Sequence, residues 1–323
     1  MNLDKINLQI GHYTDKESLT GCTVFITPDR ARIGIDIRGS NTATLNTPAF
    51  DSKASGDSVH GIVLTGGSTY GLESAFGLMK YLEEKEIGYK TRGGLIPSIT
   101  GAVIYDIAVG NGEIRPTKEN GYEAAQNAIK NNLEQGNVGV GTGATTGKWT
   151  KGTMFKGGFG IGEVKITEDI YVWAFVVTNS VGDIVNKETK EFHSDKGNYV
   201  NNISKYGIPE KLNGLLDLNE LANTNTTLAV IATNAKLYKT QLQKVSELAH
   251  DGMARSIYPV HTMQDGDVIF SLSVEPTIEL KAGFLEDTDI IGLAAADALS
   301  LAIKNSLLNA ESIKGFKALN ENI

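Results

Sequence analysis

The stretch Asn225-Thr-Thr-Leu-Ala-Val-Ile-Ala-Thr-Asn234 joins a polar segment to an abrupt apolar run. Residues 227–233 predict a buried strand, because the apolar run is short and continuous. The segment before it, 182–224, is polar and rich in Asn and Lys, which is typical of a long exposed loop. An exposed loop that leads straight into a buried strand is a natural place for a scissile bond.

Outward from this stretch, short apolar runs alternate with segments of helical periodicity. Strands are predicted at 61–64, 102–105, 163–166, 170–177 and 267–274, and helices at 70–85, 121–133, 240–254 and 291–308. The first helix is predicted to bury one face, made of Leu72, Phe76, Met79 and Leu82. Residues 23–27 and 32–38 predict a hairpin that turns at Pro28-Asp29. Together these elements predict a layered α/β protein with a largely antiparallel or mixed sheet.

Composition places the chain among ordinary globular proteins. With 41% hydrophobic and 21% charged residues, its 323 residues can bury a sizeable core. Length alone leaves domain number open, since single cores rarely grow much past roughly 250–300 residues. The formal net charge is −8 and the basic residues are scattered, so we expect no nucleic-acid partner.

Cysteine content and hydropathy bear on the compartment. Cys22 is the only cysteine, which excludes an internal disulfide and fits a reducing cytoplasm. The N-terminus has no apolar run of the kind found in signal peptides, and no stretch approaches the ~18 apolar residues of a membrane span. We therefore expect a soluble cytoplasmic protein without membrane contact.

Three familiar motifs fail on their context. The run from Gly139 to Ala144 fits G-x-G-x-x-A, but no good helix former follows it, and Gly147-Lys148 is followed by Trp149 where a phosphate-binding loop needs Ser or Thr. Gly66-Gly67-Ser68-Thr69-Tyr70 lacks the second glycine of a serine-hydrolase elbow. We expect neither a cofactor nor a metal, because no zinc-type spacing joins the five histidines, His12, His60, His193, His250 and His261.

Two short pieces suggest chemistry. A threonine hydroxyl needs a base, and the α-amine of an N-terminal threonine can serve as one, with a pKa of roughly 7.7–8.0. Before cleavage, the Thr226 hydroxyl could attack the Asn225 carbonyl and so release its own amine. Asp265 and Asp267 stand two residues apart in Asp-Gly-Asp and could orient that amine or hydroxyl together. Each piece alone also fits an ordinary polar loop or a solvated turn.

Six motifs in order strengthen this hypothesis. They are Leu64-Thr-Gly-Gly-Ser-Thr-Tyr-Gly-Leu-Glu73, Ala102-Val-Ile-Tyr-Asp106, the run 143–148, Val177-Thr-Asn-Ser-Val-Gly182, the run 225–234, and His261-Thr-Met-Gln-Asp-Gly-Asp267. Their combination resembles the DmpA-type peptidase family over about residues 9–305. That family includes L-aminopeptidase/D-esterases, β-peptidyl aminopeptidases and the nylon-oligomer hydrolase NylC.

The resemblance implies a fold and an assembly. The expected fold is an αββα sandwich, similar to that of N-terminal-nucleophile hydrolases and of the DmpA and ornithine acetyltransferase type. Self-cleavage would give an α-chain of 1–225 and a β-chain of 226–323 that remain one domain, 1–323. Family members assemble as tetramers, so a homotetramer of α/β heterodimers is expected.

The resemblance also implies the site. Thr226 corresponds to the nucleophile, Asp265 and Asp267 to the carboxylates that orient it, and Asn179 to a donor to the oxyanion. Tyr105 and Lys148 would line the cleft. For each of these the plain structural role remains open: a core tyrosine, a surface lysine, a turn asparagine.

The family's branches suggest different substrates. β-Peptidyl members place a carboxylate directly before the tyrosine to hold the substrate's ammonium, whereas this chain has Ile104. Thr226, Asp-Gly-Asp and Val-Ile-Tyr are more similar to the NylC branch, which favours an endo-acting amidase on oligoamides. Two alternatives remain: an aminopeptidase/D-esterase, and a non-catalytic family member with a binding role.

Overall fold

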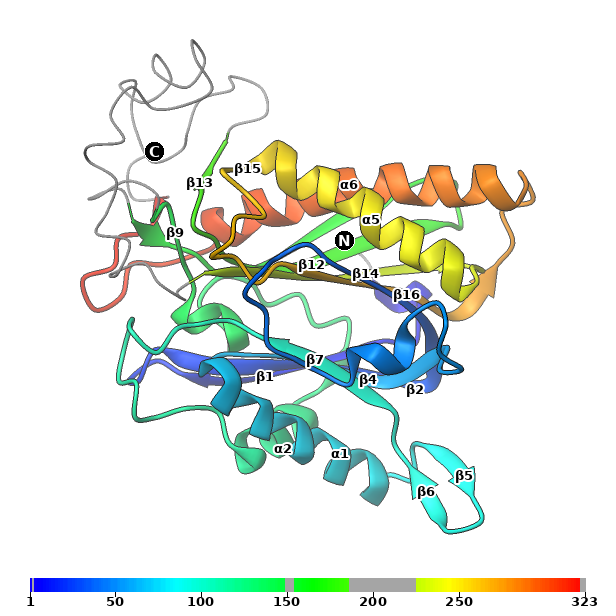
Figure 1. Cartoon of the computed structure of the whole chain (residues 1–323), viewed down its shortest axis with the longest axis horizontal. Coiled ribbons are helices and arrows are strands. Elements are labelled where there is room, and N and C mark those ends of the chain that lie inside the picture. The colour runs from blue at the N-terminus through cyan, green and yellow to red at the C-terminus, as the bar shows by residue number, and fades with distance from the viewer. Residues whose placement is uncertain (2, 149–153, 186–224, 320–323) are drawn as a thin grey trace.

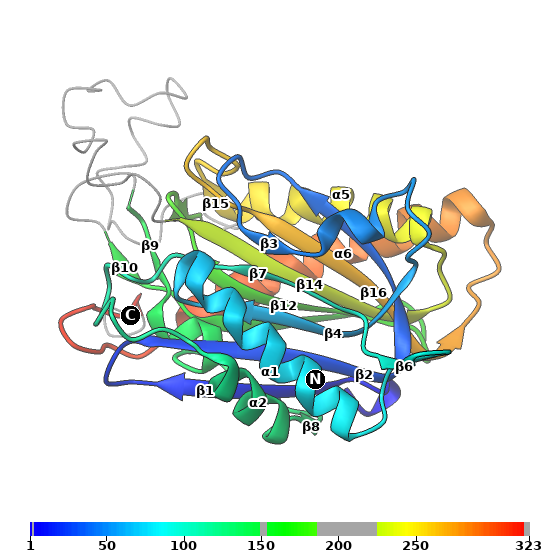
Figure 2. The same cartoon turned by 60° about the horizontal axis from the view of Figure 1, so that its bottom comes forward.

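The protein is a stack of four layers, helices outside and strands inside, as Figure 1 shows. The computed structural model describes residues 1, 3–148, 154–185 and 225–319. Helices α5 and α6 cover one layer of strands, and α1 and α2 cover the other. Figure 2 turns α1 and α2 toward the viewer, where they lie across the second layer. This arrangement confirms the predicted αββα sandwich.

The main sheet has the order β11-β12-β14-β16-β2-β4-β7-β3, with β1 also beside β2 and β8 beside β1. Its pairs are antiparallel except β4–β7 and β14–β16, so the predicted mixed sheet is confirmed. The strands of the sheet are β1 (Gln9–Asp15), β2 (Thr20–Ile37), β3 (Thr44–Leu45), β4 (Ser58–Thr65), β7 (Ile99–Val103), β8 (Ile129–Lys130), β11 (Phe159–Lys165), β12 (Tyr171–Asn179), β14 (Thr226–Ala235) and β16 (Val268–Ile278).

Smaller elements complete the described part of the chain. The paired short strands are β5 (Tyr89–Thr91) with β6 (Gly94–Ile96), β9 (Thr145–Thr146) with β10 (Phe155–Lys156), and β13 (Asp183–Ile184) with β15 (Ile257–Tyr258). The α-helices are α1 (Ser74–Glu84), α2 (Lys118–Gln126), α5 (Lys239–Ser256) and α6 (Phe284–Leu308). The 3-10 turns are η1 (Leu3–Lys5), η2 (Thr47–Phe50), η3 (Ser68–Glu73) and η4 (Gly139–Gly143).

Strand β2 links the two strand layers, and the predicted hairpin at this place is wrong. Residues 22–26 pair with β4 in one layer, a pairing that resumes briefly at Ala31 and Arg32, and residues 32–37 pair with β16 in the other. The register shifts between Ile26 and Ala31, where Arg30 has a φ of 57°. Pro28-Asp29 therefore bends a single 18-residue strand and does not reverse it, because each half finds a partner in a different layer.

Apolar side chains fill all three spaces between the layers. The central core lies between the strand layers and contains Phe25, Trp173 and Phe270, all fully buried. The outer cores lie under α5 and α6, around Met253 and Leu299, and under α1, around Leu78. Burial of this area from water on both faces of each sheet is the main force holding the layers together.

Two helices differ from their prediction. Phe76 of α1 is 51% exposed, because Ser74, Ala75, Gly77, Leu78 and Leu82 form the buried side instead. The buried face of α1 differs from the predicted one because small residues allow this helix to pack closely on α2. A Cβ on Gly77 would lie 1.9 Å from the Lys118 carbonyl oxygen. α2 is also shorter than expected, ending at Gln126 before β8.

Helix α6 is long and apolar enough, by length and composition alone, to cross a membrane. Its most apolar window is 61% buried inside the fold, however. Gly160 and Gly162 of β11 let α6 approach closely, since a Cβ at either would lie 2.1 Å from a carbonyl oxygen of α6. The helix therefore serves here as a core helix of the sandwich. Most of the predicted loop, residues 186–224, lies outside the described residues.

Candidate active site

The predicted nucleophile begins strand β14 in the middle of its layer. Thr226 pairs with Asn179 of β12, and β14 continues between β12 and β16 to Ala235. The Thr226 hydroxyl donates a short hydrogen bond to the carbonyl oxygen of Asn225. Thr226 is only 4% exposed. The hydroxyl thus lies against the peptide bond that the sequence marks as scissile.

The turn Asp265-Gly266-Asp267 lies directly beside this bond. Asn225 and Asp265 form a parallel bridge, and the Gly266 N–H donates to the Asn225 carbonyl oxygen at 3.2 Å. A Cβ added to Gly266 would meet the Thr226 Oγ at 2.7 Å, too close for any side chain. Glycine at 266 therefore lets the backbone donor reach the carbonyl and leaves room for the hydroxyl.

Both carboxylates are buried but play different roles. Asp265 accepts from the Thr262 hydroxyl at 2.7 Å, from the Thr262 N–H at 3.0 Å and from the Val181 N–H at 3.3 Å. Asp267 accepts from the Thr227 N–H at 2.7 Å through one oxygen and from His261 through the other. The prediction that the two act from one turn is compatible with this geometry, although each faces its own set of donors.

Lys148 and Asn179 form a buried pair next to Thr226. The Lys148 ammonium donates to Asn179 Oδ1 at 2.8 Å, and the Thr145 N–H donates to the same oxygen at 3.0 Å. Asn179 Nδ2 donates to the Tyr105 carbonyl oxygen at 3.2 Å. The Thr226 hydroxyl and the Gly266 N–H thus both donate to the Asn225 oxygen, while the Asn179 amide connects Lys148 to the Tyr105 backbone.

The structure brings all the predicted site residues to one end of the sandwich, including Tyr105, whose backbone is tied to Asn179. Ile104 is different. Its side chain is fully buried in the central core with Ala102 and Ala144. An apolar residue at 104 is therefore needed for packing, and it carries less weight for substrate preference than the sequence suggested.

Burial shifts the ionisation of this cluster. Desolvation lowers the pKa of Lys148 to about 7, against the opposing charges of Asp265 and Asp106. Desolvation, with the nearby charge of Asp267, raises the pKa of Asp265 to about 6. Both groups therefore change charge near neutral pH, and a catalytic acid or base is most effective when its pKa lies near the working pH.

Sequence reasoning missed four residues around the site. His261, treated as an ordinary histidine, contacts Asp267 at 2.7 Å, and Gly266 supplies the backbone donor. Asp106 is buried, accepts from the Gly67 N–H and the Thr20 hydroxyl, and has its pKa raised to about 6 by burial. Lys156 is fully buried, and its ammonium donates to three carbonyl oxygens at 2.8 Å. His261, Gly266 and Asp106 lie within the motifs quoted above, and their place in these motifs was the sequence signal that could have identified them.

Known proteins share this architecture. An L-aminopeptidase D-Ala-esterase/amidase from Ochrobactrum anthropi, described as a variant of the Ntn-hydrolase fold, superposes with a TM-score of 0.70. It is 20% identical, over 96% of this chain and 87% of that one. A Burkholderia β-aminopeptidase gives the same TM-score at 17% identity, over 97% of this chain and 87% of that one. The chain therefore has an N-terminal-nucleophile hydrolase fold.

Sequence comparison assigns the family. Residues 4–320 match the model of peptidase family S58, and the chain belongs to this family of amide- and peptide-bond hydrolases. A protein of Mycobacterium leprae named an uncharacterized aminopeptidase is 35% identical, over 97% of this chain and 91% of its own length. A 6-aminohexanoate-oligomer endohydrolase of Agromyces is 28% identical, over 84% of this chain and 73% of its own length. The resemblance inferred from the motifs, including NylC-like proteins, is confirmed.

Proposed function

We propose that this hydrolase activates itself by cutting the Asn225-Thr226 bond, with Thr226 as the nucleophile. Maturation would give chains 1–225 and 226–323, which remain one folded unit. The single observation that supports the proposal is the Thr226 hydroxyl against the Asn225 carbonyl, with a backbone N–H donating to the same oxygen.

Cleavage follows from this arrangement. The Thr226 Oγ attacks the Asn225 carbonyl carbon and its proton passes to a base. The C–N bond then breaks and the Thr226 nitrogen takes up a proton, which leaves an ester between the Asn225 carbonyl and Oγ. The Gly266 N–H stabilises the negative charge on the Asn225 oxygen during attack. Water hydrolyses the ester, releasing the Asn225 carboxylate and the free threonine.

Lys148 is the base that we assign to the first step. Its depressed pKa leaves a substantial neutral fraction near pH 7, and it sits one hydrogen bond from Asn179, the strand partner of Thr226. A buried amine that ionises near the working pH is suited to accept the hydroxyl proton.

Substrate hydrolysis repeats the chemistry with the new amine. The Thr226 α-amine takes the Oγ proton, and Oγ attacks the substrate carbonyl to form an acyl-enzyme that water then hydrolyses. Asp265 and Asp267 orient the amine and the first peptide of β14, while Asn179 stabilises the oxyanion and Tyr105 and Lys148 line the cleft. A donor to an oxyanion is worth about 2.7–4 kcal/mol of barrier where measured.

Intact mass and N-terminal sequencing test the proposal. An active sample should contain two chains that begin at Met1 and Thr226. An active sample in which every molecule begins only at Met1 would refute the cleavage. A two-chain product without amide hydrolysis would instead favour a family member with a binding role.

For the substrate we propose internal amide bonds of oligoamides, with an aminopeptidase as the alternative. An aminopeptidase holds the substrate's ammonium with a carboxylate, yet Asp106, Asp265 and Asp267 each already accept two or more protein hydrogen bonds. The name of the mycobacterial relative supports the alternative, and that of the Agromyces relative supports oligoamides.

A matched pair of substrates separates the two. Hydrolysis of the linear 6-aminohexanoate trimer is compared with that of its N-acetylated form and of an aminoacyl p-nitroanilide. Comparable rates on the free and acetylated trimers support cleavage of internal bonds. Activity on the anilide alone, abolished by acetylation, supports the aminopeptidase. We further propose a cytoplasmic homotetramer of α/β heterodimers, which size-exclusion light scattering of the matured protein would test.

A further inference from the structure

The ring of His261 contacts the Asp265-Gly266-Asp267 turn of the candidate active site. Its Nδ1 lies 2.7 Å from Asp267 Oδ2, and its own backbone N–H donates to the same oxygen at 3.2 Å. The residue has a φ of 56°, a left-handed conformation that is uncommon outside glycine, although His, Asn and Asp adopt it more often than other residues do. The backbone is thus held in a costly conformation that places two donors on one carboxylate oxygen.

The other oxygen of Asp267 reaches the strand that carries the nucleophile. Asp267 Oδ1 accepts the Thr227 N–H at 2.7 Å. That N–H belongs to the Thr226-Thr227 peptide, so its position sets the plane from which the Thr226 side chain projects. A rotation of the Asp267 carboxylate would break both contacts together. His261 therefore acts on Thr226 through one carboxylate and one peptide.

The surroundings of His261 fix its tautomer. Its ring meets His250 of α5 edge to face, with centroids 4.7 Å apart, and His261 Nε2 is buried without a hydrogen-bond partner among the described residues. Nδ1 carries the proton that Asp267 accepts, and a bare Nε2 avoids burying an unpaired N–H. Burial is the main cause that lowers the pKa of His250 to about 3, so this neighbour stays neutral.

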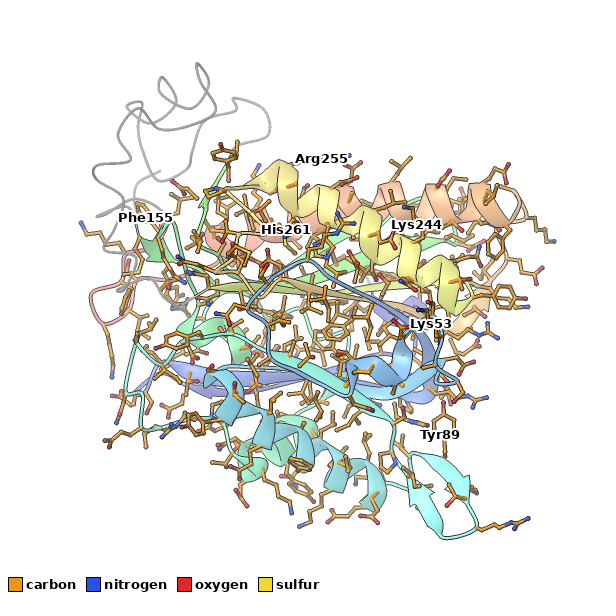
Figure 3. All side chains as sticks on the ribbon, viewed as in Figure 1. Lys53, Tyr89, Phe155, Lys244, Arg255 and His261 are labelled. Carbon is orange, nitrogen blue, oxygen red and sulfur yellow. The ribbon has the colours of Figure 1, made fainter. Side chains whose placement is uncertain are left out.

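The charged groups beyond His250 are already paired. Asp36 of β2 lies 3.5 Å from His250 Nε2 and 2.7 Å from the Arg38 guanidinium. Figure 3 labels His261 beside α5, the helix that bears His250. Asp267 is thus the carboxylate to which the His261 ring binds, and the neutral ring of His250 packs against the His261 ring.

We infer that His261 is a positioning residue for Thr226: it locks the Asp267 carboxylate so that this carboxylate holds the Thr226-Thr227 peptide in the reactive orientation. The inference rests on the proposed self-cleavage. It assigns no proton transfer to His261. The residue is expected to affect the rate of the chemical step and to have little effect on the overall fold.

Three variants isolate this role. His261→Gly removes the ring and tolerates the left-handed backbone. His261→Asn tolerates it too and offers an amide N–H near the position of Nδ1. His60→Gly is the matched control, because His60 lies in another part of the fold. Its ring packs against that of Tyr89 and accepts a hydrogen bond from the Ser98 N–H. Each chain is made by cell-free synthesis, and the appearance of the 226–323 fragment is followed by intact mass, with and without added imidazole.

His261→Gly should slow cleavage about 10- to 100-fold, the range for losing one hydrogen bond to a charged group. Added imidazole should restore much of the rate in His261→Gly and leave His60→Gly unchanged. His261→Asn should cleave within a few-fold of the natural chain, and the thermal midpoint of Thr226→Ala should change little when His261→Gly is added.

The possible failures are distinguishable. Natural-rate cleavage by His261→Gly, or a slowed rate that neither Asn nor imidazole restores, would overturn the positioning role while leaving self-cleavage intact. No cleavage of the natural chain, or cleavage of Thr226→Ala, would overturn the proposed function together with this inference.

Discussion

Two parallel strand pairs, one in each strand layer, meet at the same end of the sandwich. β14 and β16 bring their first residues there, so that Thr226 lies beside the Asp265–Asp267 turn. β4 and β7 bring their last residues there, followed by Gly67 and by Tyr105-Asp106. Asn179 connects the two through its hydrogen bond to the Tyr105 carbonyl oxygen.

The difference lies in what the polar groups contact. In the first pair they contact the bond whose cleavage we propose: the Thr226 hydroxyl and the Gly266 N–H both donate to the Asn225 oxygen. In the second pair Asp106 binds the Gly67 N–H and the Thr20 hydroxyl, which hold the loops of its own layer. Both strand pairs bury ionisable groups, so burial alone does not identify a catalytic residue. Contact with the reacting atoms does.

The largest expected effect is at Thr226. Thr226→Ala should remain a single 323-residue chain without amide hydrolysis, because the substitution removes the hydroxyl that serves both reactions. Thr226→Ser should still cleave, since it retains a hydroxyl at the same carbon. Intact mass and hydrolysis of the trimer report the two outcomes. Two chains in the Thr226→Ala sample would assign cleavage to another group.

The next largest effect on cleavage is expected at Asp265 and Asp267, the two carboxylates beside Thr226. Asp265→Asn and Asp267→Asn should each slow cleavage by at least ~100-fold, because each carboxylate orients part of the turn or strand at Thr226. The double variant should cost far less than the sum, as for groups acting on one nucleophile. Cleavage rates of all three variants test this. Strictly additive losses would mean that the two act separately.

A smaller, graded effect is expected with pH. As pH falls, Asp265 gains a proton near pH 6 and Lys148 becomes charged near pH 7, so each loses its proposed role. The cleavage rate should therefore rise from acid pH through about 7 and level off above it. Lys148→Met should cleave slowly and lack the inflection near 7. An unchanged profile in that variant would exclude Lys148 as the base.

The smallest catalytic effect is expected in the other layer, at Asp106. Its folded-state pKa of about 6 exceeds the ordinary 3.8, so the folded chain binds the proton more tightly and loses stability as pH rises between these values. Asp106→Asn should flatten this dependence, measured by urea unfolding in the Thr226→Ala background, and change cleavage less than about tenfold. A loss as large as that for Asp267→Asn would erase the distinction between the layers.

Most residues of the candidate site were predicted from motifs that follow one another along the sequence. The apolar run after Thr226 forms β14, and the quoted motifs contain Asn179, Lys148, Asp265 and Asp267, which the fold gathers at one end. Local pattern was misleading where a single segment serves two layers. The bend at Pro28-Asp29 predicted a hairpin, but only the separate partners β4 and β16 show that β2 continues through it.

The sequence by itself determined the family, most strands and helices along the chain and the candidate nucleophile, because these depend on periodicity and on motifs readable along the chain. Only the tertiary structure decided that Gly266 donates to the Asn225 oxygen, that His261 contacts Asp267 and that Ile104 belongs to the core. The physical reason is that hydrogen bonds and burial depend on distances between segments far apart in sequence. A glycine, a histidine or an isoleucine carries no local mark of the partner that folding brings to it.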